Sequence, residues 1–350
     1  MARSPFVSII IPHYRGREIL HRCLQALAQD EYQPREIILV DNASTDGSVD
    51  AGVEAFSGVK VIRSRRNLGF AAGCNLGMRF ANGEYFVLLN DDAVVTPGWL
   101  AAMVDYMQKH EDVAAVQPKI KSLDEPDRFD YAGAAGGMID MWGFPFARGR
   151  IFTTLERDEG QYDDHGEIFW ASGTCTLLRR SAVEKVGDLD PRFFAHMEEI
   201  DLNWRFHLAG YRVVYLPDAV VFHNAGTTLA QQAPQKVFLN HRNNLLMLLK
   251  NYSGITLLWL FPVRLLFEWA AMGFALLQRD GRQALAIAKA LGALPAYWSH
   301  IRRERARVKR LRKISDAAIR RKMYRQSIVL QYYLLKRKTY RELPIATDNT

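Results

Sequence analysis

The chain has 350 residues, of which 49% are hydrophobic and 24% charged, so it can bury a sizeable core and is not expected to be disordered. The formal net charge of +8 is uneven, because the segment from residue 301 onward carries 16 Lys and Arg against 4 Asp and Glu, which leaves the first 300 residues net acidic. A basic tail of this kind predicts contact with a polyanion, either nucleic acid or an anionic membrane.

The cysteines and the N-terminus indicate a reducing, cytoplasmic compartment. Cys23, Cys74 and Cys175 are odd in number and widely separated, which argues against a disulfide framework and a zinc knuckle. The apolar run near the N-terminus is too short for a signal-peptide core, and no small-residue cleavage site follows it.

The first half of the chain alternates apolar, β-branched runs with amphipathic segments, which predicts β-α-β units around a mostly parallel sheet. Strands are expected at 6–12, 36–41, 59–63 and 84–90, and helices at 16–29, 47–56 and 69–81. The second helix should take its N-cap from Ser44, Thr45 or Asp46. Because the strand runs are apolar throughout, helices should cover both faces of the sheet.

The second half begins with an expected helix and strand and then loses its periodicity. The helix is expected at 97–110 and the strand at 113–120, and the region 122–168 reads as a loop-rich insert near a site. Further elements are expected at 171–180, 198–210, 211–217, 219–223 and 236–250. These elements predict one α/β domain over 1–250 and a helical extension over 251–350.

The extension begins with an apolar segment, 254–281, that is long enough to span a bilayer but contains charged residues. On a helical wheel at roughly 100° per residue, Thr256, Arg264, Glu268 and Gln278 fall within about 120°. One polar stripe on an apolar helix favours a helix lying in the membrane interface, with a spanning helix and a helix packed on the domain as alternatives.

A second apolar helix is expected at 284–298, and the basic segment 301–313 follows it directly. Positive charge beside an apolar segment is typical of the cytoplasmic side of a membrane, where each Lys or Arg near anionic lipid contributes about 1 kcal/mol. Apolar residues such as Ile301 and Val308 are interleaved with the charges, which favours an anionic membrane surface and predicts no nucleic-acid partner.

Polar residues follow three of the expected strands. Ligands bind beyond the carboxyl ends of strands in open parallel sheets, so Pro12, Tyr14, Asp41 and Asp92 should meet at one rim. The glycine-rich loops of dinucleotide and P-loop sites are missing from the sequence. A diphosphate then needs a hard divalent cation, held by one or two carboxylates, and Asp91 and Asp92 suit that task; an ordinary turn is the alternative.

Six segments together carry a family resemblance. They are "VSIIIPHYRG", "ILVDNASTDGS", "NLGFAAGCNLG", "LLNDDA", "SGTCTLLRR" and "FFAHMEEIDLNWR". Over about residues 5 to 225 the chain resembles bacterial family-2 glycosyltransferases of the GT-A fold, a Rossmann-like, mostly parallel α/β fold, and within them the rhamnosyltransferase-like branch that builds cell-surface polysaccharides. The resemblance implies inverting transfer from a nucleoside-diphosphate sugar, usually with Mg²⁺ or Mn²⁺.

The resemblance also implies a nucleotide-sugar site. Pro12, Tyr14 and Asp41 would hold the base and ribose, and Asn67 and Asn75 would complete that pocket. Gly73 would allow close backbone approach, although it could also be a helix-entry glycine.

The metal and sugar contacts implied by the resemblance come from other segments. Asp92 would bind the metal, Asp91 the donor sugar or the metal, and Asn90 would only neighbour them. His223 would complete the coordination, with a purely structural role as the alternative. The remaining sugar contacts, to donor or acceptor, would come from Trp170, Ser172 and Gly173.

The catalytic base is expected at the start of the helix at 198–210. An inverting transfer needs a base that removes the proton of the acceptor hydroxyl. The resemblance implies Glu199, where the family usually has Asp, and Glu198 is the competitor. Asp201 and Arg205 are spaced as an ordinary helix salt bridge.

These expectations describe a metal-dependent transferase on the inner face of a bacterial plasma membrane. It would move a deoxyhexose, with rhamnose as first candidate, from a dTDP- or UDP-linked donor onto a lipid-linked saccharide. The alternatives are a nucleotidyltransferase and a non-enzymatic protein that binds a membrane or nucleic acid through its tail.

Overall fold

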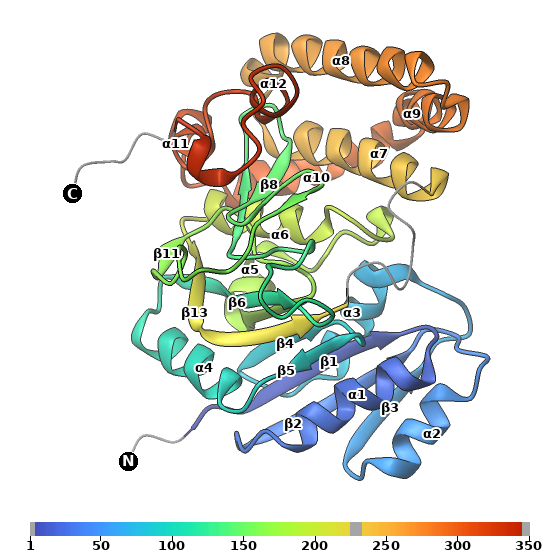
Figure 1. Cartoon of the computed structure of the whole chain (residues 1–350), viewed down its shortest axis with the longest axis vertical. Helices are drawn as coiled ribbons and strands as arrows, with labels where there is room; N and C mark the ends of the chain where they lie inside the picture. Colours follow the sequence, from blue (N-terminus) through green and yellow to red (C-terminus); the bar gives the residue numbers. More distant parts are fainter. Residues whose placement is uncertain (1–3, 225–232, 345–350) are drawn as a thin grey trace.

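The computed structural model describes residues 4–224 and 233–344, and in this part of the chain the main sheet has nine strands (Figure 1). The strand order is β11-β13-β6-β12-β4-β1-β2-β3, and β5 pairs with β13. The strands are β1 (Val7–His13), β2 (Arg35–Asp41), β3 (Val59–Arg63), β4 (Tyr85–Leu89), β5 (Ala93–Val95), β6 (Val113–Ser122), β11 (Gly166–Glu167), β12 (Cys175–Arg179) and β13 (Arg212–His223). Only β5, β11 and β12 of these oppose the common direction, so the predicted mostly parallel sheet is confirmed.

The described part of the chain has twelve α-helices, and those before residue 210 cover both faces of this sheet. The twelve are α1 (Arg17–Ala28), α2 (Ser48–Ala55), α3 (Gly69–Phe80), α4 (Trp99–Lys109), α5 (Arg180–Val186), α6 (Glu198–Leu208), α7 (Pro234–Asn251), α8 (Gly254–Leu277), α9 (Gly281–Ala293), α10 (Trp298–Leu311), α11 (Asp316–Arg321) and α12 (Ile328–Tyr333). Along β1, Ile9 and Ile11 join the core beneath α1 and α4, whereas Ile10 joins the core beneath α3. The alternation buries both faces, which is why the strand runs are apolar throughout.

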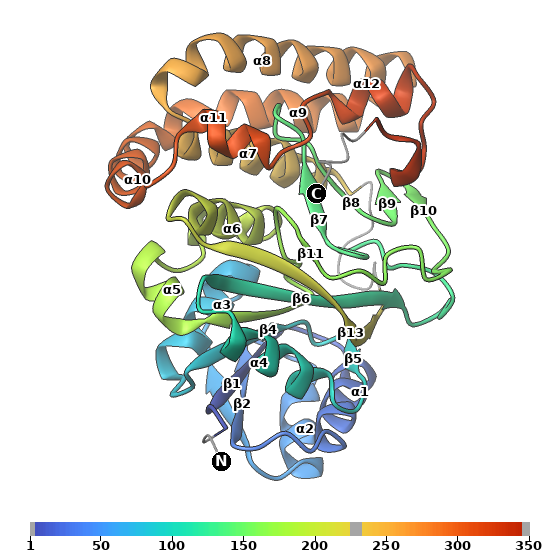
Figure 2. The ribbon, with the colours of Figure 1, turned by 90° about the vertical axis from the view of Figure 1, so that its left-hand side faces the viewer.

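The region predicted as a loop-rich insert contains a second, antiparallel sheet, so that prediction was incomplete. Its strands are β7 (Gly137–Ile139), β8 (Pro145–Ala147), β9 (Arg150–Ile151) and β10 (Thr154–Leu155). Strands of two or three residues are too short to show a period of two in the sequence. Figure 2 shows β7 to β10 between the main sheet and the helical layer of α8, α9 and α12.

Several of the predicted elements have different boundaries in the structure, and three of them differ for a clear physical reason. The strands expected at 211–217 and 219–223 form the single strand β13, whose pairing with β6 shifts register between Leu216 and Val220, around Pro217. Proline has no N–H to give to the ladder, so the strand bulges there and then continues. The helix expected at 284–298 ends at Ala293, and Pro295 lies in a 3-10 turn before α10 begins.

The N-cap of α2 was also predicted wrongly. Gly47, at φ 71°, occupies the cap position, and no side chain of the cap residue bonds to the helix. Asp46 stands one residue earlier and still accepts a hydrogen bond from the Ser48 N–H at 3.2 Å. The Asp46 carboxylate therefore satisfies a backbone N–H in the first turn of α2, although Asp46 is not the N-cap residue.

The polar side of α8 is buried against the protein and its apolar side is exposed, the reverse of an ordinary surface helix. Arg264 and Glu268 are 2% and 1% exposed and form an ion pair of 2.6 Å, and His241 Nδ1 of α7 lies 2.5 Å from the same Glu268 carboxyl. The Arg264 guanidinium also donates to Asn244 Oδ1 at 3.1 Å. The predicted polar stripe thus faces the protein, except for Gln278, which is exposed and follows the helix.

The opposite side of α8 is exposed and apolar. Its exposed residues are Ile255, Leu258, Trp259, Leu266, Trp269, Phe274, Leu276 and Leu277. Within the described residues α8 is the one helix long and apolar enough to cross a membrane, a test that core helices of soluble proteins also pass. Only 22% of its most apolar window is buried, so α8 is not such a core helix. In Figures 1 and 2 it forms the outermost layer at the end of the molecule away from β2 and α2.

The basic segment after residue 300 contributes in part to internal contacts. Arg305 donates to the carbonyl oxygens of Leu249 and Tyr252, and Arg312 donates to that of Asn251, so both satisfy the end of α7. The tail is therefore folded onto the domain at these positions, and only its remaining cations are available to a partner.

Candidate active site

The central feature of the site is a pairing of strands from distant parts of the chain. The short strand β5 begins directly after Asp92 and pairs antiparallel with the end of β13, so that His223 stands opposite Ala93. This register brings His223 Nε2 to 2.9 Å from Asp92 Oδ1. The structure thus joins the two residues that the resemblance assigned to the metal.

A third residue, which the sequence did not predict, orients the histidine. Asp130 Oδ1 lies 2.9 Å from His223 Nδ1, and Asp130 and His223 are 2% and 4% exposed. Burial lowers the pKa of His223, but the hydrogen bonds and charges of Asp130 and Asp92 outweigh it and raise that pKa to about 10. Binding of a cation at Nε2 therefore requires release of a proton.

The arrangement Asp130–His223–Asp92 fits a divalent cation. A carboxylate on one ring nitrogen of a ligating histidine fixes the ring and its tautomer, as is usual at metal sites. The described residues contain no group of three or more His, Cys, Asp or Glu side chains placed to hold a metal alone. Two protein ligands are enough when phosphate oxygens of the substrate supply the others. Asp92 and His223 would hold such a cation.

Asp91 points to a different partner from Asp92. Its Oδ2 lies 2.6 Å from His13 Nδ1, and His13 Nε2 lies 2.7 Å from the Ser48 hydroxyl. Burial raises the pKa of Asp91, and the hydrogen bond from His13 opposes that rise. His13, which the sequence interpretation left out although it stands in "PHYRG", links the ends of β1 and β4 to α2.

Asp41 lies at the neighbouring strand end, as predicted. Its Oδ2 accepts a hydrogen bond of 2.8 Å from Arg63, and its Oδ1 accepts one of 2.8 Å from the Ser44 N–H. Pro12 is buried at the end of β1, and Tyr14 is half-buried with Arg15 4.8 Å from its ring centroid. The predicted rim therefore forms at the ends of β1, β2 and β4.

The entrance to α3 closes one side of this rim. Asn42 donates to the Gly69 carbonyl at 3.1 Å and accepts from the Leu68 N–H at 2.7 Å, a pair of contacts the sequence did not reveal. Gly69 has φ 76°, and a Cβ there would stand 2.4 Å from the Phe194 carbonyl oxygen. Asn67 is exposed and accepts from the Gly69 N–H at 2.8 Å, so it shapes the turn.

Two predicted nucleotide contacts prove to be packing positions. A Cβ at Gly73 would lie 3.2 Å from the Pro12 Cβ, so glycine lets α3 approach β1 closely. Asn75 donates to the Leu189 carbonyl at 2.7 Å and accepts from the Leu189 N–H at 3.1 Å. The structure therefore shows a scaffold contact for Asn75, and its contact with the nucleotide stays a prediction.

The predicted sugar contacts also differ from the expectation. Trp170 is 4% exposed, packs in a core cluster and donates to the Met138 carbonyl at 2.8 Å. The Ser172 hydroxyl donates a hydrogen bond to the Ala132 carbonyl and accepts one from the Thr174 N–H. These two bonds hold the loop that carries Asp130. Of the three, Gly173 alone is half-buried, where a Cβ would lie 3.1 Å from the Phe70 ring. Trp170 and Ser172 therefore support the site from outside it.

The loop before α6 is strained. Phe194, His196 and Met197 have φ of 66°, 71° and 74°, which side chains other than glycine rarely adopt. The buried Asn243 amide of α7 donates to the carbonyl oxygens of residues 193, 195 and 196 at 2.8 to 2.9 Å. Such strain persists only where the surroundings enforce it, and it is concentrated at functional sites.

This loop presents two glutamates with different surroundings. Glu198 is 3% exposed, and its charge raises the pKa of the buried Cys74 thiol, in addition to the effect of burial on that thiol. Glu199 is half-buried, and burial raises its pKa to about 7. Burial and the charge of Glu199 raise the pKa of Glu198 well above its usual range. Glu199 is thus the carboxyl with access to solvent and a pKa suited to proton transfer at neutral pH.

The predicted salt bridge of α6 is confirmed as a structural one. Arg205 Nε lies 3.1 Å from Asp201 Oδ2, and Lys250 Nζ lies 3.0 Å from the same oxygen. Asp190 extends this buried network to Lys250 and His300. The network joins α6, α7 and α10, so it holds the helix of the glutamates against the helical layer.

Comparison with known proteins agrees with this geometry. The family model described as glycosyl transferase family 2 matches residues 8–187. The chain is 30% identical over 263 residues to the N-acetylglucosaminyl-diphospho-decaprenol L-rhamnosyltransferase of Mycobacterium tuberculosis, an alignment that covers 70% of this chain and 83% of that protein. It is 31% identical over 243 residues to the O-antigen biosynthesis protein RfbC of Myxococcus xanthus, covering 66% of this chain and 18% of that one.

Solved structures show the same fold at lower sequence identity. GalNAc-T7 with UDP, GalNAc and Mn²⁺ aligns with a TM-score of 0.54 and 16% identity, over 70% of this chain and 47% of that one. The mannosyltransferase PcManGT from Pyrobaculum calidifontis, in complex with GDP-Man and Mn²⁺, aligns with a TM-score of 0.52 and 18% identity, over 88% of this chain and 85% of that one. The family match and the relatives named as glycosyltransferases, not these structures, set aside the nucleotidyltransferase and the non-enzymatic alternatives.

Proposed function

Because this chain belongs to glycosyl transferase family 2, we propose that it transfers a sugar, with inversion, from a dTDP- or UDP-linked donor to a lipid-linked saccharide. Rhamnose is the first candidate, since the similar mycobacterial protein is named as a rhamnosyltransferase acting on a decaprenol diphosphate that carries N-acetylglucosamine. The observation that carries the proposal is the Asp92–His223–Asp130 arrangement beside the strand ends.

In this proposal, one group of residues acts on the leaving diphosphate and another residue acts on the acceptor hydroxyl. Asp92 and His223 would hold a Mg²⁺ or Mn²⁺ ion, which supplies positive charge to the departing diphosphate. Asp130 keeps the His223 ring oriented, and Asp41 and Tyr14 line the side where the nucleoside would lie. Glu199, half-buried at the start of α6, would take the proton of the acceptor hydroxyl.

A donor and acceptor screen tests this function. The purified full chain is incubated with Mn²⁺, farnesyl-diphospho-N-acetylglucosamine and one of dTDP-rhamnose, UDP-glucose or GDP-mannose, and products are followed by mass spectrometry. We expect a mass gain of one deoxyhexose with dTDP-rhamnose. Transfer from GDP-mannose alone would contradict the donor assignment, and failure with every donor would contradict the acceptor class.

We also propose that the protein works at the inner face of the plasma membrane. The exposed side of α8 carries eight large apolar residues, and Trp298, Leu330 and Leu334 add to the exposed apolar surface of the helical extension. Tryptophan is typical of membrane interfaces. An in-plane position is supported over a span because Arg264 and Glu268 on the other side of α8 are already paired within the protein. The net positive tail complements anionic lipid.

Replacing Leu258, Leu266 and Leu277 together by Ser should release the protein from vesicles. Each of these side chains is at least 66% exposed, so the fold loses little, whereas burial of a leucine in an apolar phase contributes about 1.5–3 kcal/mol. We expect binding to phosphatidylglycerol vesicles, measured by sedimentation, to weaken by more than about tenfold. Serine replacements of three exposed residues away from the helical extension, Val53, Glu54 and Phe80, serve as the control, and equal binding by both variants would contradict the docking surface.

A further inference from the structure

Arg150 of β9 is a buried cation, and the described residues place no counter-charge beside its guanidinium. It is 7% exposed, and within residues 4–224 and 233–344 no hydrogen bond or ion pair reaches its guanidinium, whose Nε is completely buried. The centroid of the Tyr131 ring lies 4.6 Å from the guanidinium carbon. A buried charge is destabilising unless it is paired, and one aromatic contact compensates only part of that cost. Such a residue indicates a ligand that brings the negative charge.

A second cation faces the same ring. Lys236, half-buried in the first turn of α7, has its Nζ 5.8 Å from the Tyr131 centroid. Burial lowers the pKa of Lys236, and the charge of Arg150 lowers it further, so the two cations repel each other. The N-terminus of α7 adds the positive end of its helix dipole. Three sources of positive potential therefore converge on Tyr131.

This cationic cluster adjoins both halves of the candidate active site. Tyr131 directly follows Asp130, the residue that orients His223. On the other side, the charge of Lys236 reaches His196, two residues before Glu198, and with burial lowers the His196 pKa to about 4. His196 is then a neutral imidazole, and its buried Nε2 has no partner in the described part of the chain.

We propose that Arg150, Lys236 and Tyr131 form a binding site for the diphosphate of the acceptor. The inference rests on the proposed function in taking the acceptor to be lipid-linked. Two cations beside a helix N-terminus match a group with two or more negative charges. The donor diphosphate would be balanced by the cation at Asp92 and His223, whereas an acceptor diphosphate arrives without a protein-bound metal. Arg150 comes from β9 and Lys236 from α7, and Figure 2 shows β9 between the main sheet and the helical layer that bears the apolar outer face.

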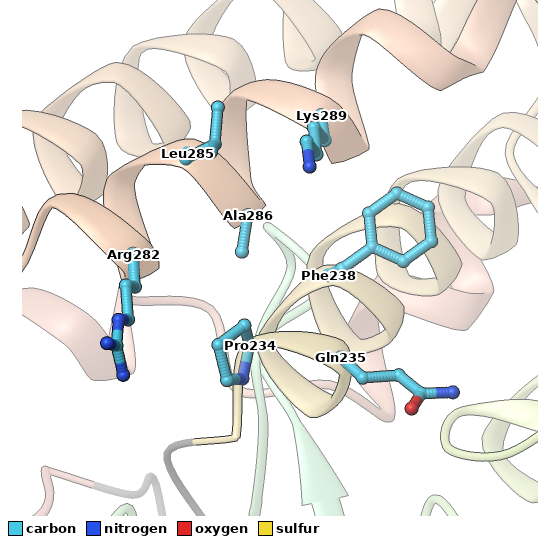
Figure 3. Close-up of a pocket in the computed structure, with 7 residues that line it drawn as sticks. All are labelled: Pro234, Gln235, Phe238, Arg282, Leu285, Ala286 and Lys289. Atoms are coloured by element: carbon cyan, nitrogen blue, oxygen red, sulfur yellow. The ribbon is translucent and has the colours of Figure 1, made fainter.

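A neighbouring pocket provides a matched control. Figure 3 shows a pocket of about 390 Å³ between α7 and α9, with Phe238, Leu285 and Ala286 in its lining and Arg282 and Lys289 from α9. These two cations are exposed and carry the same charge as Arg150 and Lys236, but they do not face Tyr131. Replacing both by Gln lowers the net charge of the region by two, against one for Lys236→Gln, so the control exceeds the test variant in the charge it removes.

Calorimetry of the full-length protein with farnesyl diphosphate tests the site without requiring turnover. Lys236→Gln and Arg150→Lys, which keeps the charge but loses the planar guanidinium, should each weaken binding by about tenfold or more, since a charge-assisted hydrogen bond contributes roughly that factor. The double variant Arg282→Gln/Lys289→Gln should stay within about twofold of the wild type. Thermal unfolding of each variant verifies that it folds, and Lys236→Gln decides the matter if Arg150→Lys does not fold.

Two further measurements distinguish binding of the acceptor diphosphate from binding of the donor diphosphate. Binding of dTDP or UDP with Mn²⁺ should be unchanged in Lys236→Gln; if nucleotide binding is lost instead, the cations serve the donor and the inference is wrong. In turnover, Lys236→Gln should raise the KM for farnesyl-diphospho-N-acetylglucosamine but not for octyl N-acetylglucosaminide, which has no phosphate. Unchanged farnesyl diphosphate binding in Lys236→Gln, or an equal loss in the control variant, would overturn the site. Loss in Lys236→Gln alone, with no sugar transfer to any acceptor, would uphold it while the proposed function fails.

Discussion

Replacing Asp92 by Asn should lower kcat/KM by about a thousandfold, because a cation would then be held by His223 alone and would no longer neutralise the leaving diphosphate. The expected loss corresponds to about 4 kcal/mol of transition-state stabilisation, at 1.4 kcal/mol for each factor of ten. The substitution keeps the shape of the side chain and removes its charge. The fold should therefore survive, and the rate of sugar transfer at saturating Mn²⁺ measures the effect.

Calorimetry of Mn²⁺ in the presence of dTDP gives a readout that does not depend on turnover. Asp92→Asn should weaken Mn²⁺ binding strongly, whereas Asp124→Asn, at an exposed position just after β6, should match the wild type in both assays. If Asp92→Asn keeps full Mn²⁺-dependent activity, the metal does not bind at this pair. Asp130→Asn should show an intermediate loss, since orienting partners of ligating histidines typically contribute about 10-fold to 100-fold.

Glu199→Gln should lower kcat by about a hundredfold to ten-thousandfold and leave nucleotide binding intact, because the amide cannot accept the proton of the acceptor hydroxyl. Glu198→Gln is the matched comparison on the adjacent residue. Burial and the charge of Glu199 raise the pKa of Glu198, so a neutral amide should perturb Glu198 less than it perturbs Glu199. If Glu198→Gln is inactive and Glu199→Gln is active, the base has been assigned to the wrong glutamate.

The pH dependence follows from the same residue. Burial raises the Glu199 pKa to about 7, and only the deprotonated carboxylate acts as a base. The transfer rate should therefore fall by about tenfold for each pH unit below 7 and level off above it. A profile measured from pH 5.5 to 8.5 at saturating donor tests this, and a rate that is flat across pH 7 would count against Glu199.

The fold was largely predictable because its strands are continuous apolar runs. Burial on both faces leaves no alternation to misinterpret, and the strands at 36–41 and 59–63 were predicted to within one residue of β2 and β3. The small sheet of β7 to β10 was not predicted, since strands of two or three residues carry no periodic signal. The polar stripe of α8 was found, but which side faces the protein depends on His241 and Asn244 of α7, which no pattern in α8 reveals.

Site residues at the ends of strands could be predicted from the sequence, whereas residues that only orient another side chain could not. Asp41, Asp91 and Asp92 lie at the predicted rim, and the family resemblance supplied His223, which the structure places beside Asp92. Asp130 and His13 were missed, because their roles depend on a partner far away in the sequence. Asn75 and Trp170 lie within recognisable motifs, but in the structure their side chains donate hydrogen bonds to backbone carbonyl groups. The motifs did not predict these contacts.

The proposed cation site is complete only after β5 has paired with β13. Asn90 and His223 are 133 residues apart, and the segment matched by the family model ends at residue 187, before His223 is reached. During synthesis the aspartates emerge long before their histidine, so a nascent chain has no complete cation site until β13 has docked. If a cation binds at this pair as proposed, it would stabilise the closed sheet as a whole, by an amount that grows with its free concentration, and Mn²⁺ affinity would report whether folding has been completed.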